Sequence, residues 1–303
     1  MNVQMLLIVI SSAIVIKRSA AMLATHIKCR TGVYPRSSIE RFPVPDDKVD
    51  WSTEFKEYNP PNYTSPSIHR KPWADPDIDD HMFNPKWNSI DGNVDRTSYM
   101  GKYQIVNRIP QNPVGRTGIR GRGVLGRWGP NHAADPVVTR WKKQPSGETD
   151  TDESNQPILQ FVAIKRGDTG EWALPGGMVD PGEKVTTTAV REFQEEAINS
   201  MNMSKGELDV WKARFQDFFS NGQEVFKGYV DDIRNTDNAW METMAYNFHD
   251  ENGSIVGSLN LHAGDDAVGV RWVDITPDLR LYASHQDIVE LVLRKLSVTP
   301  LPY

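Results

Sequence analysis

The sequence predicts an α/β protein, in which a mixed sheet lies between helices and is preceded by an irregular, mostly extended accessory domain. Two observations support this. The C-terminal half alternates short apolar strand patterns with two or three amphipathic helical patterns, which is typical of a layered α/β fold. The N-terminal half is rich in proline and turn residues, which remove backbone donors and prevent long regular elements.

Length and composition set the outer limits. With 303 residues the chain can form one large domain or two ordinary ones, and 38% hydrophobic with 24% charged residues is typical of a globular protein with a core. A net charge of -6 argues against general affinity for nucleic acid or an anionic membrane. Cys29 is the only cysteine, so no internal disulfide can form and a reducing compartment fits.

The amino terminus has the composition of a targeting leader. The apolar run Met5–Ile16 is shorter than the roughly 20 residues that span a bilayer, so no stable membrane span is expected. No acidic residue precedes Glu40, and basic residues and serines are frequent, which is typical of mitochondrial transit peptides. We therefore expect a mitochondrial protein whose leader, residues 1–39, is not part of the fold. The alternatives are a signal anchor, or a cytosolic protein made from a second start at Met22.

The remaining chain divides into an accessory region over residues 40–150 and a second domain over residues 151–303, joined by a polar, acidic linker or hairpin loop. Ser284 is expected to cap a final helix with an apolar stripe at Ile288, Val289, Val292 and Leu296. Alternating or apolar runs predict strands over residues 103–106, 137–141, 158–165, 172–174, 225–230, 240–248 and 268–273.

The most informative stretch is a glycine loop followed by a helix. At ~100° per residue, the predicted helix collects apolar side chains on one side and three carboxylates on another. Like charges so close repel one another unless a cation lies among them, and hard divalent ions such as Mg²⁺ take oxygen ligands and are often shared with a substrate phosphate. The apolar side contains Ala189, Val190, Phe193 and Ala197, and the acidic side contains Glu192, Glu195 and Glu196. A solvated acidic face is the alternative for three glutamates alone.

The ordered pattern is more specific than the carboxylates. Gly177 is followed after five residues by Glu183, and after seven more by Arg191-Glu192-Phe193, one residue and Glu195-Glu196. This order resembles the Nudix box, the signature of hydrolases that cleave a nucleoside diphosphate linked to another moiety. The resemblance implies the Nudix α/β/α sandwich. Ile198 and Asn199 depart from the pattern, where the family usually has glycine and an aliphatic residue, and this leaves only the helix exit in doubt.

A second unusual stretch, Asn112–Val138, alternates glycines with Arg116, Arg120, Arg122 and Arg127. Its backbone N–H groups and guanidinium forks could approach a phosphate or a ribose. The alternative is a structural loop whose arginines pair with carboxylates. We discount a disordered nucleic-acid tail, because the stretch also contains apolar residues and an ordered-looking turn.

Blocks outside the box extend the resemblance to about residues 45–290. YNPPNYTSP, DGNVDRTSYMGKY, WALPGGMVDPGE, VFKGYVDDIRNTDNAWMET and LYASH look like the mitochondrial ADP-ribose pyrophosphatases of the Nudix superfamily, and also like the Nudix-like tail of the ADP-ribose-gated melastatin-type cation channel. The resemblance implies an enzyme that hydrolyses ADP-ribose to AMP and ribose 5-phosphate with Mg²⁺, Mn²⁺ being the alternative ion. It makes residues 40–150 an accessory substrate-binding domain and residues 151–303 the Nudix hydrolase domain. We expect a monomer.

Roles for individual residues follow from matching the blocks. Glu192 and Glu196, with Glu195 in support, would hold the metal. Arg191 would buttress Glu195 or Glu183 within the catalytic helix, and a purely structural salt bridge is equally favoured. Asp266 or Asp265 would be the base that activates water, or else part of an ordinary acidic turn. Expected substrate contacts are His132, Leu174, Gly176, Asp232, Arg234, Tyr282, Ser284 and His285.

Two other functions stay open. The first is a sensor that binds ADP-ribose without cleaving it, like the channel tail. The vertebrate channel tail has lost the Glu-Phe and the following acidic pair of the motif, whereas Arg191-Glu192-Phe193 and Glu195-Glu196 are present here. The second is a Nudix hydrolase acting on other nucleoside diphosphate derivatives. We expect Trp240 to belong to the core.

Overall fold

The structure is a computed structural model that describes residues 26–167, 170–197, 206, 215, 217–257, 267–276, 278–282 and 284–296, with the side chains of residues 194, 196, 197, 267 and 268 outside the description. The chain forms two compact units. Unit 1 comprises residues 1–131 and 228–242, and unit 2 comprises residues 132–227 and 243–303. Strands β7, β11 and β12 have residues in both units.

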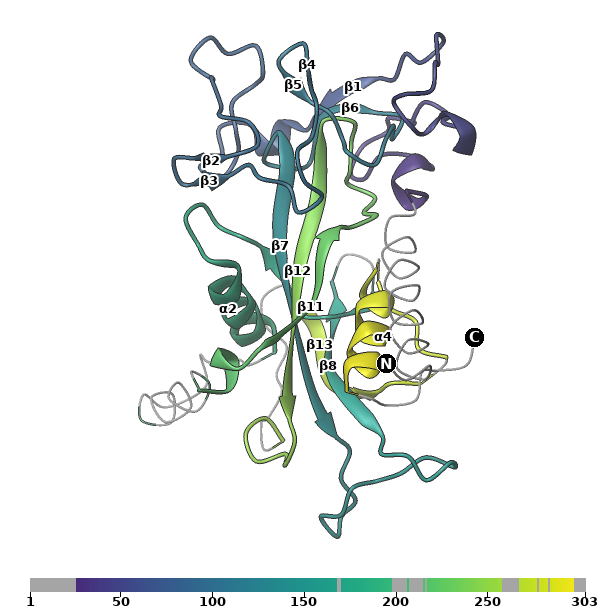
Figure 1. Ribbon diagram of the computed structural model, residues 1–303, viewed down its shortest axis with the longest axis vertical. Helices are drawn as coiled ribbons and strands as arrows, with labels where there is room; N and C mark the ends of the chain where they lie inside the picture. The colour runs from purple at the N-terminus through teal and green to yellow at the C-terminus, as the bar shows by residue number, and fades with distance from the viewer. Residues whose placement is uncertain are drawn as a thin grey trace, which may run out of the picture. The chain divides into compact units, whose positions relative to one another are not determined.

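A sheet of five main strands passes through the described part of the chain in the order β11-β12-β7-β8-β13, and the short strands β9 and β10 pair with β8 and β7 (Figure 1). β7 and β8 are antiparallel, with Thr139 opposite Phe161, and β8 and β13 are antiparallel, with Val270 opposite Ile164. The bounds are β7 Gly129–Trp141, β8 Leu159–Arg166, β9 Trp172–Ala173, β10 Gly177–Met178, β11 Gln223–Tyr229, β12 Ala239–Asp250 and β13 Ala267–Asp274. Each strand overlaps one expected from the sequence, except β10, which lies in the glycine loop, where the sequence predicts no strand.

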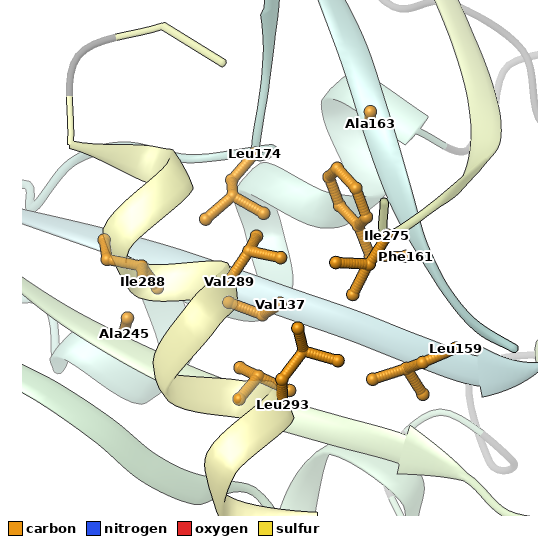
Figure 2. Close-up of a cluster of buried hydrophobic side chains, with 11 residues drawn as sticks. Val137, Leu159, Phe161, Ala163, Leu174, Ala245, Ile275, Ile288, Val289 and Leu293 are labelled. Carbon is orange, nitrogen blue, oxygen red and sulfur yellow. The ribbon is translucent and has the colours of Figure 1, made fainter. Parts of the chain in front are cut away.

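In unit 2, neighbouring residues of the same strand serve opposite faces of the sheet. Val137 and Phe161 pack beneath α4 (His285–Lys295), whose side chains Val289 and Leu293 point at the sheet (Figure 2). The following residues, Val138 and Val162, lie on the other face with Phe193 of helix α2 (Val185–Ala197). Burial of each such side chain stabilises the fold by roughly 1.5–3 kcal/mol. The unit is therefore the expected sandwich: among the described residues, α4 covers one face of the sheet and α2 packs on the other.

Unit 1 is built from short pieces. Parallel β1 and β6 pair, and β2–β3 and β4–β5 form small antiparallel ladders. The frequent prolines limit each piece, because proline lacks the N–H that a ladder or helix needs. The pieces are η1 Lys28–Arg30, η2 Asp46–Lys48, β1 Asn62–Thr64, η3 Pro66–Ile68, β2 Ile90–Asp91, β3 Val94–Asp95, β4 Ile105–Val106, β5 Ile109–Pro110 and β6 Arg120–Gly123. An irregular, mostly extended accessory region is confirmed.

Polar and aromatic contacts stabilise unit 1 where regular structure does not. The buried Asp75 carboxylate accepts two hydrogen bonds from Arg96, at 2.8 and 2.9 Å, and one from Arg127 at 2.8 Å. Trp240 is fully buried against Tyr103, with ring centroids 5.2 Å apart. The expectation that Trp240 belongs to the core is therefore correct. Removing one partner of a buried ion pair, such as that of Asp75 and Arg96, strongly destabilises the fold, because the other charge is left buried and unpaired.

The expected domain limits differ from the structure at both ends of the accessory region. Residues 26–39 are part of unit 1, since Cys29 and Tyr34 are buried there, so the part of the leader outside the fold cannot extend to residue 39. The acidic stretch near residue 150 joins β7 to its neighbour β8, so it is a hairpin loop within unit 2 and not a linker between units. The boundary between the units falls after residue 131, inside β7, which begins at Gly129 and thus earlier than the apolar run from Val137 suggests.

None of the helices in the described part of the chain combines the length and the apolar character needed to cross a bilayer.

Candidate active site

The glycine loop is fixed by pairing with β7. In β10, Gly177 lies opposite Ala134 and Met178 lies opposite Ala133. Neither loop glycine has room for a side chain: a Cβ on Gly176 would lie 2.3 Å from Asp135 Oδ1, and one on Gly177 would lie 2.2 Å from Glu192 Oε1. The missing side chain at Gly177 therefore lets the Glu192 carboxylate lie directly against the loop backbone.

Helix α2 supplies the carboxylates. Its apolar side is buried as expected, with Ala189 and Phe193 inaccessible to solvent. Glu183 precedes the helix and accepts a hydrogen bond from Thr188 Oγ1 at 2.7 Å, which fixes the entry of the chain into the helix. The side chain of Glu192 is nearly buried, at 12% exposure, whereas that of Glu195 is 57% exposed.

Arg191 connects these acids to one another and to the loop. Its Nη1 lies 2.9 Å from Glu192 Oε1 and 3.0 Å from Glu195 Oε2. Its Nε and Nη2 each donate to Glu183 at 3.1 Å, and Nη2 also donates to the Met178 carbonyl at 3.4 Å. Arg191 therefore pairs with both acids named from the sequence, and with Glu192 as well.

The acids titrate differently because their surroundings differ. Burial raises the pKa of Glu192, and the nearby Arg191 only partly offsets this. Burial also acts on Glu183, but hydrogen bonds from Arg191 and Thr188 outweigh it and lower the pKa of that carboxyl. The Glu183 hydrogen bond is also the main reason that the pKa of Arg191 is raised. Of these two acids, only Glu183 thus has hydrogen bonds that outweigh the effect of burial on its pKa.

The donor set fits a hard divalent cation. Carboxylate oxygens are the ligands such ions prefer, and the space over Gly177 is kept for one of them. The described side chains contain no group of three or more acidic, histidine or cysteine residues arranged to hold an ion, so Glu192 and Glu195 are the described part of the expected set. The side chain of Glu196 and residues Asp265 and Asp266 lie outside the described residues.

Several expected substrate contacts come together beside the loop in unit 2. His285 Nδ1 accepts a hydrogen bond from the Leu174 N–H at 2.9 Å, and the His285 ring meets Tyr282 edge-on with centroids 5.8 Å apart. Ser284 holds the N-cap position of α4, yet its side chain makes no capping hydrogen bond, contrary to expectation. Its buried Oγ has no hydrogen-bond partner among the described residues, so this hydroxyl is available to a ligand. His132 is at the start of unit 2, and its carbonyl accepts from the Val179 N–H at 2.9 Å.

One acidic residue of this site was missed from the sequence. Asp135 is buried in β7, faces Gly176 through Oδ1 and accepts a hydrogen bond from Thr243 Oγ1 through Oδ2 at 2.6 Å. A charged residue inside an otherwise buried strand was the available signal, because such a group is costly to bury without a partner or a function.

The other two expected contacts lie in a turn of unit 1. Asp232 Oδ1 accepts from the Arg234 backbone N–H and from its Nε, both at 2.8 Å, and Oδ2 accepts from Nη2 at 2.7 Å. This fork-to-fork geometry fixes the guanidinium on its own turn. Asp232 is buried and the Arg234 side chain is about one-third exposed, at 32%.

The arginines of the Asn112–Val138 stretch are mostly structural. Arg116 is buried, donates to backbone carbonyls of Lys48, Asp50 and Thr53, and its guanidinium lies 4.8 Å from the Trp51 ring centroid. Arg122 donates to the Asp75 and Gly126 carbonyls, and Arg127 pairs with Asp75. Arg120 is exposed. The other three arginines are therefore structural, but only Arg122, through Asp77, and Arg127 pair with carboxylates as the interpretation as a structural loop expects.

Comparison with known proteins agrees with this site. Residues 44–129 match the model of the NUDT9-like N-terminal domain, and residues 150–290 match that of the NUDIX domain. The rat protein named ADP-ribose pyrophosphatase, mitochondrial, is 55% identical over 274 residues, covering 89% of this chain and 78% of the relative. A Caenorhabditis elegans protein named nudix hydrolase 6 is 48% identical over 275 residues, covering 89% of this chain and 98% of the relative.

A cation channel also matches. The transient receptor potential channel subfamily M member-like 2 of Nematostella vectensis is 48% identical over 274 residues, covering 89% of this chain but only 18% of the channel. The fold and the carboxylate helix define a hydrolase of the Nudix class, whose members use divalent metal ions. The chain belongs to the Nudix family, with a NUDT9-like N-terminal domain.

Proposed function

We propose that this enzyme hydrolyses ADP-ribose to AMP and ribose 5-phosphate. The observation that carries the proposal is the Glu192 carboxylate packed on Gly177 and held by Arg191, a built oxygen site beside a glycine loop. The rat relative, whose name is ADP-ribose pyrophosphatase, supports this choice of substrate within the family.

Mg²⁺ is the proposed ion, with Mn²⁺ as the alternative, and Glu192, Glu195 and Glu196 are the proposed ligands. A bound divalent cation would neutralise charge on the leaving phosphate and orient the attacking water. Arg191 acts on the carboxylates and not on the substrate: it holds Glu192 and Glu195 in place and ties them to the Met178 carbonyl. Asp266 or Asp265 is the proposed base.

Substrate contacts are proposed for both units. In unit 2 the buried Ser284 hydroxyl and the Tyr282–His285 pair support a polar subsite next to Leu174 and Gly176. In unit 1 the Asp232–Arg234 pair is proposed to bind the terminal ribose and a phosphate. His132 completes the proposed set. We further propose that the protein is mitochondrial, as the name of the rat relative says of that protein, and monomeric.

The alternative is an ADP-ribose sensor, which the match to the channel favours. Initial rates of AMP release from ADP-ribose, nucleotide sugars and dinucleoside polyphosphates, each with and without Mg²⁺, separate the functions. We expect metal-dependent release of AMP and ribose 5-phosphate, fastest from ADP-ribose. Tight binding of ADP-ribose without AMP formation would establish the sensor, and faster turnover of another compound would assign another substrate.

A further inference from the structure

We propose that an N-terminal strap, residues 26–44, positions the Asp232–Arg234 turn and thereby acts in substrate binding. The strap lies within unit 1 and, except for its last residue, precedes the matched N-terminal domain (purple in Figure 1). The inference rests on the proposed function, because that function gives Asp232 and Arg234 their substrate contacts. Strap residues act through the turn and are positioning residues.

The first contact lies at the start of the turn. The Asp231 carboxylate is buried and accepts three consecutive backbone N–H groups of the strap, from Ile27 at 2.7 Å, Lys28 at 2.8 Å and Cys29 at 3.0 Å. These are the N–H groups at the beginning of η1, which no residue of the helix itself can satisfy. One acidic side chain therefore joins the turn to the strap.

The strap also holds the turn's carbonyl groups in succession. Tyr34 OH donates to the Arg234 carbonyl at 2.7 Å. Arg41 Nη2 donates to the carbonyls on either side, Ile233 at 2.6 Å and Asn235 at 3.1 Å. Both strap side chains are buried, and the Arg41 guanidinium lies 5.1 Å from the Tyr34 ring centroid.

The two strap side chains that hold the turn also bind other segments of unit 1. The strap can therefore support the turn, because its own position does not depend on the turn alone. Tyr34 OH accepts from the Val124 N–H at 2.9 Å, and Gly123 has no room for a Cβ against that hydroxyl. Arg41 Nη1 donates to the Thr117 carbonyl at 3.0 Å. The strap thus connects the turn to two other segments of unit 1, so these segments help to fix the position of the turn.

The consequence for Arg234 follows from its local geometry. Asp232 fixes the guanidinium relative to the turn backbone, so the backbone position sets where the guanidinium lies. Ordered contacts of this kind matter for binding, because a misplacement of about 1 Å can cost a large factor in rate or affinity. Removing the Tyr34 hydroxyl leaves the ring packing but releases the central carbonyl of the turn.

The test is a double-mutant cycle of Tyr34→Phe with Arg234→Ala in the full chain. Two quantities are measured: the dissociation constant of ADP-ribose without added metal, and kcat and KM with Mg²⁺. We expect Tyr34→Phe to raise the dissociation constant and KM about tenfold with a smaller change in kcat, and to have little further effect once Arg234→Ala is present. Tyr63→Phe, in which a neighbouring ring loses its hydroxyl, is the matched control and should change neither quantity.

Equal losses from Tyr34→Phe with and without Arg234 would overturn the inference, as would no loss at all. Amide hydrogen exchange gives a second readout: exchange over residues 231–236 should accelerate in Tyr34→Phe and Asp231→Asn, and unchanged exchange there contradicts the proposal. If the two substitutions are coupled in ADP-ribose binding but no AMP forms, the inference stands and the proposed hydrolase activity is rejected. If ADP-ribose is hydrolysed but the two substitutions are not coupled, the activity stands and the inference is rejected.

Discussion

At the residue scale, the site depends on a side chain that is absent. Gly177 leaves space over the loop backbone, and the Glu192 carboxylate fills it. Arg191 then holds that carboxylate from the other side at 2.9 Å. The position of Glu192 is therefore set by contacts on two sides before any ion or substrate binds.

Replacing Gly177 by alanine tests this packing. The new Cβ would lie 2.2 Å from Glu192 Oε1, so the carboxylate must rotate away. Because the displaced atoms are at the end of a flexible side chain, we expect the free energy of unfolding to change by less than about 1 kcal/mol, while kcat/KM falls at least about tenfold. Denaturant unfolding and steady-state kinetics measure the two effects.

Gly206→Ala is the matched control, because a Cβ at Gly206 meets nothing within 4 Å. Its kinetics should match those of the unmodified enzyme. If Gly177→Ala retained full activity, the Glu192 position would be irrelevant to catalysis.

Removing the charge of Glu192 is the direct test of its role. Glu192→Gln keeps the shape of the side chain, so the fold should persist and the melting temperature should change little. Turnover of ADP-ribose should fall by about two orders of magnitude or more, because a ligand of the cation loses its charge. Glu148→Gln, at an exposed position of the β7–β8 loop, is the control. Equal turnover in the two variants contradicts the assignment.

The resemblance of one ordered pattern to the Nudix box predicted Gly177, Glu183, Arg191 and Glu192, because all of them lie within one loop and the helix that follows it. Asp135 could not be found in this way. It reaches Gly176 only because β10 pairs with β7, a contact between segments far apart in the sequence. The unused capping hydroxyl of Ser284 also depends on packing that no local pattern encodes.

At the element scale, the connection between β11 and β12 is held through its acidic residues. Asp231 binds the strap, Asp232 binds Arg234, and Asp237 is fully buried, accepting from Tyr58 OH at 2.6 Å and from the Thr117 N–H and hydroxyl at 2.7 and 2.8 Å. From the sequence this segment was only a polar loop. The partners of Asp231 and Asp237 are more than a hundred residues away along the chain, so local propensity carries no information on them.

Asp237 makes the free energy of unfolding depend on pH. Burial raises its pKa from 3.8 to about 6, although its hydrogen bonds oppose the shift. The stabilising contribution of the neutral acid is therefore complete below about pH 4 and is lost as the pH rises through 6. Relative to Asp237→Asn, the native chain should lose roughly 2–3 kcal/mol of unfolding free energy between pH 4 and 7.

Denaturant unfolding of both chains across this pH range measures the difference, in which the titration of other groups cancels. For Glu57→Gln, at an exposed position, the curve of unfolding free energy against pH should instead run parallel to that of the native chain. Parallel curves for Asp237→Asn and the native chain would show that Asp237 titrates normally in the fold.

At the scale of the whole molecule, the pattern of strands and helices predicted the sandwich of unit 2, because each strand and helix carries its own apolar periodicity. The limits of the units were not predicted. Residues 26–39 join unit 1 through buried hydrogen bonds, such as those of Tyr34 and those to Asp231, and residues 228–242 also through the packing of Trp240 against Tyr103. Composition classified residues 26–39 as leader because it registers charge and not contacts.

Truncation tests this assignment. A chain that lacks residues 1–25 keeps every described contact and should retain the stability and activity of the full chain. A chain that lacks residues 1–39 loses the Tyr34 hydrogen bonds and the N–H groups that satisfy Asp231, and should be less stable by at least about 3 kcal/mol. Thermal unfolding and ADP-ribose turnover compare the two chains. Equal stability and turnover would show that residues 26–39 belong to the leader and not to the fold.

The carboxylates of α2 are proposed to bind a divalent cation against a diphosphate. A crystal structure of the protein with Mg²⁺ and a non-hydrolysable ADP-ribose analogue tests it most directly. We predict an ion ligated by Glu192 and shared with the diphosphate of the analogue. An analogue bound elsewhere, with Glu192 contacting neither an ion nor a phosphate, would contradict the account.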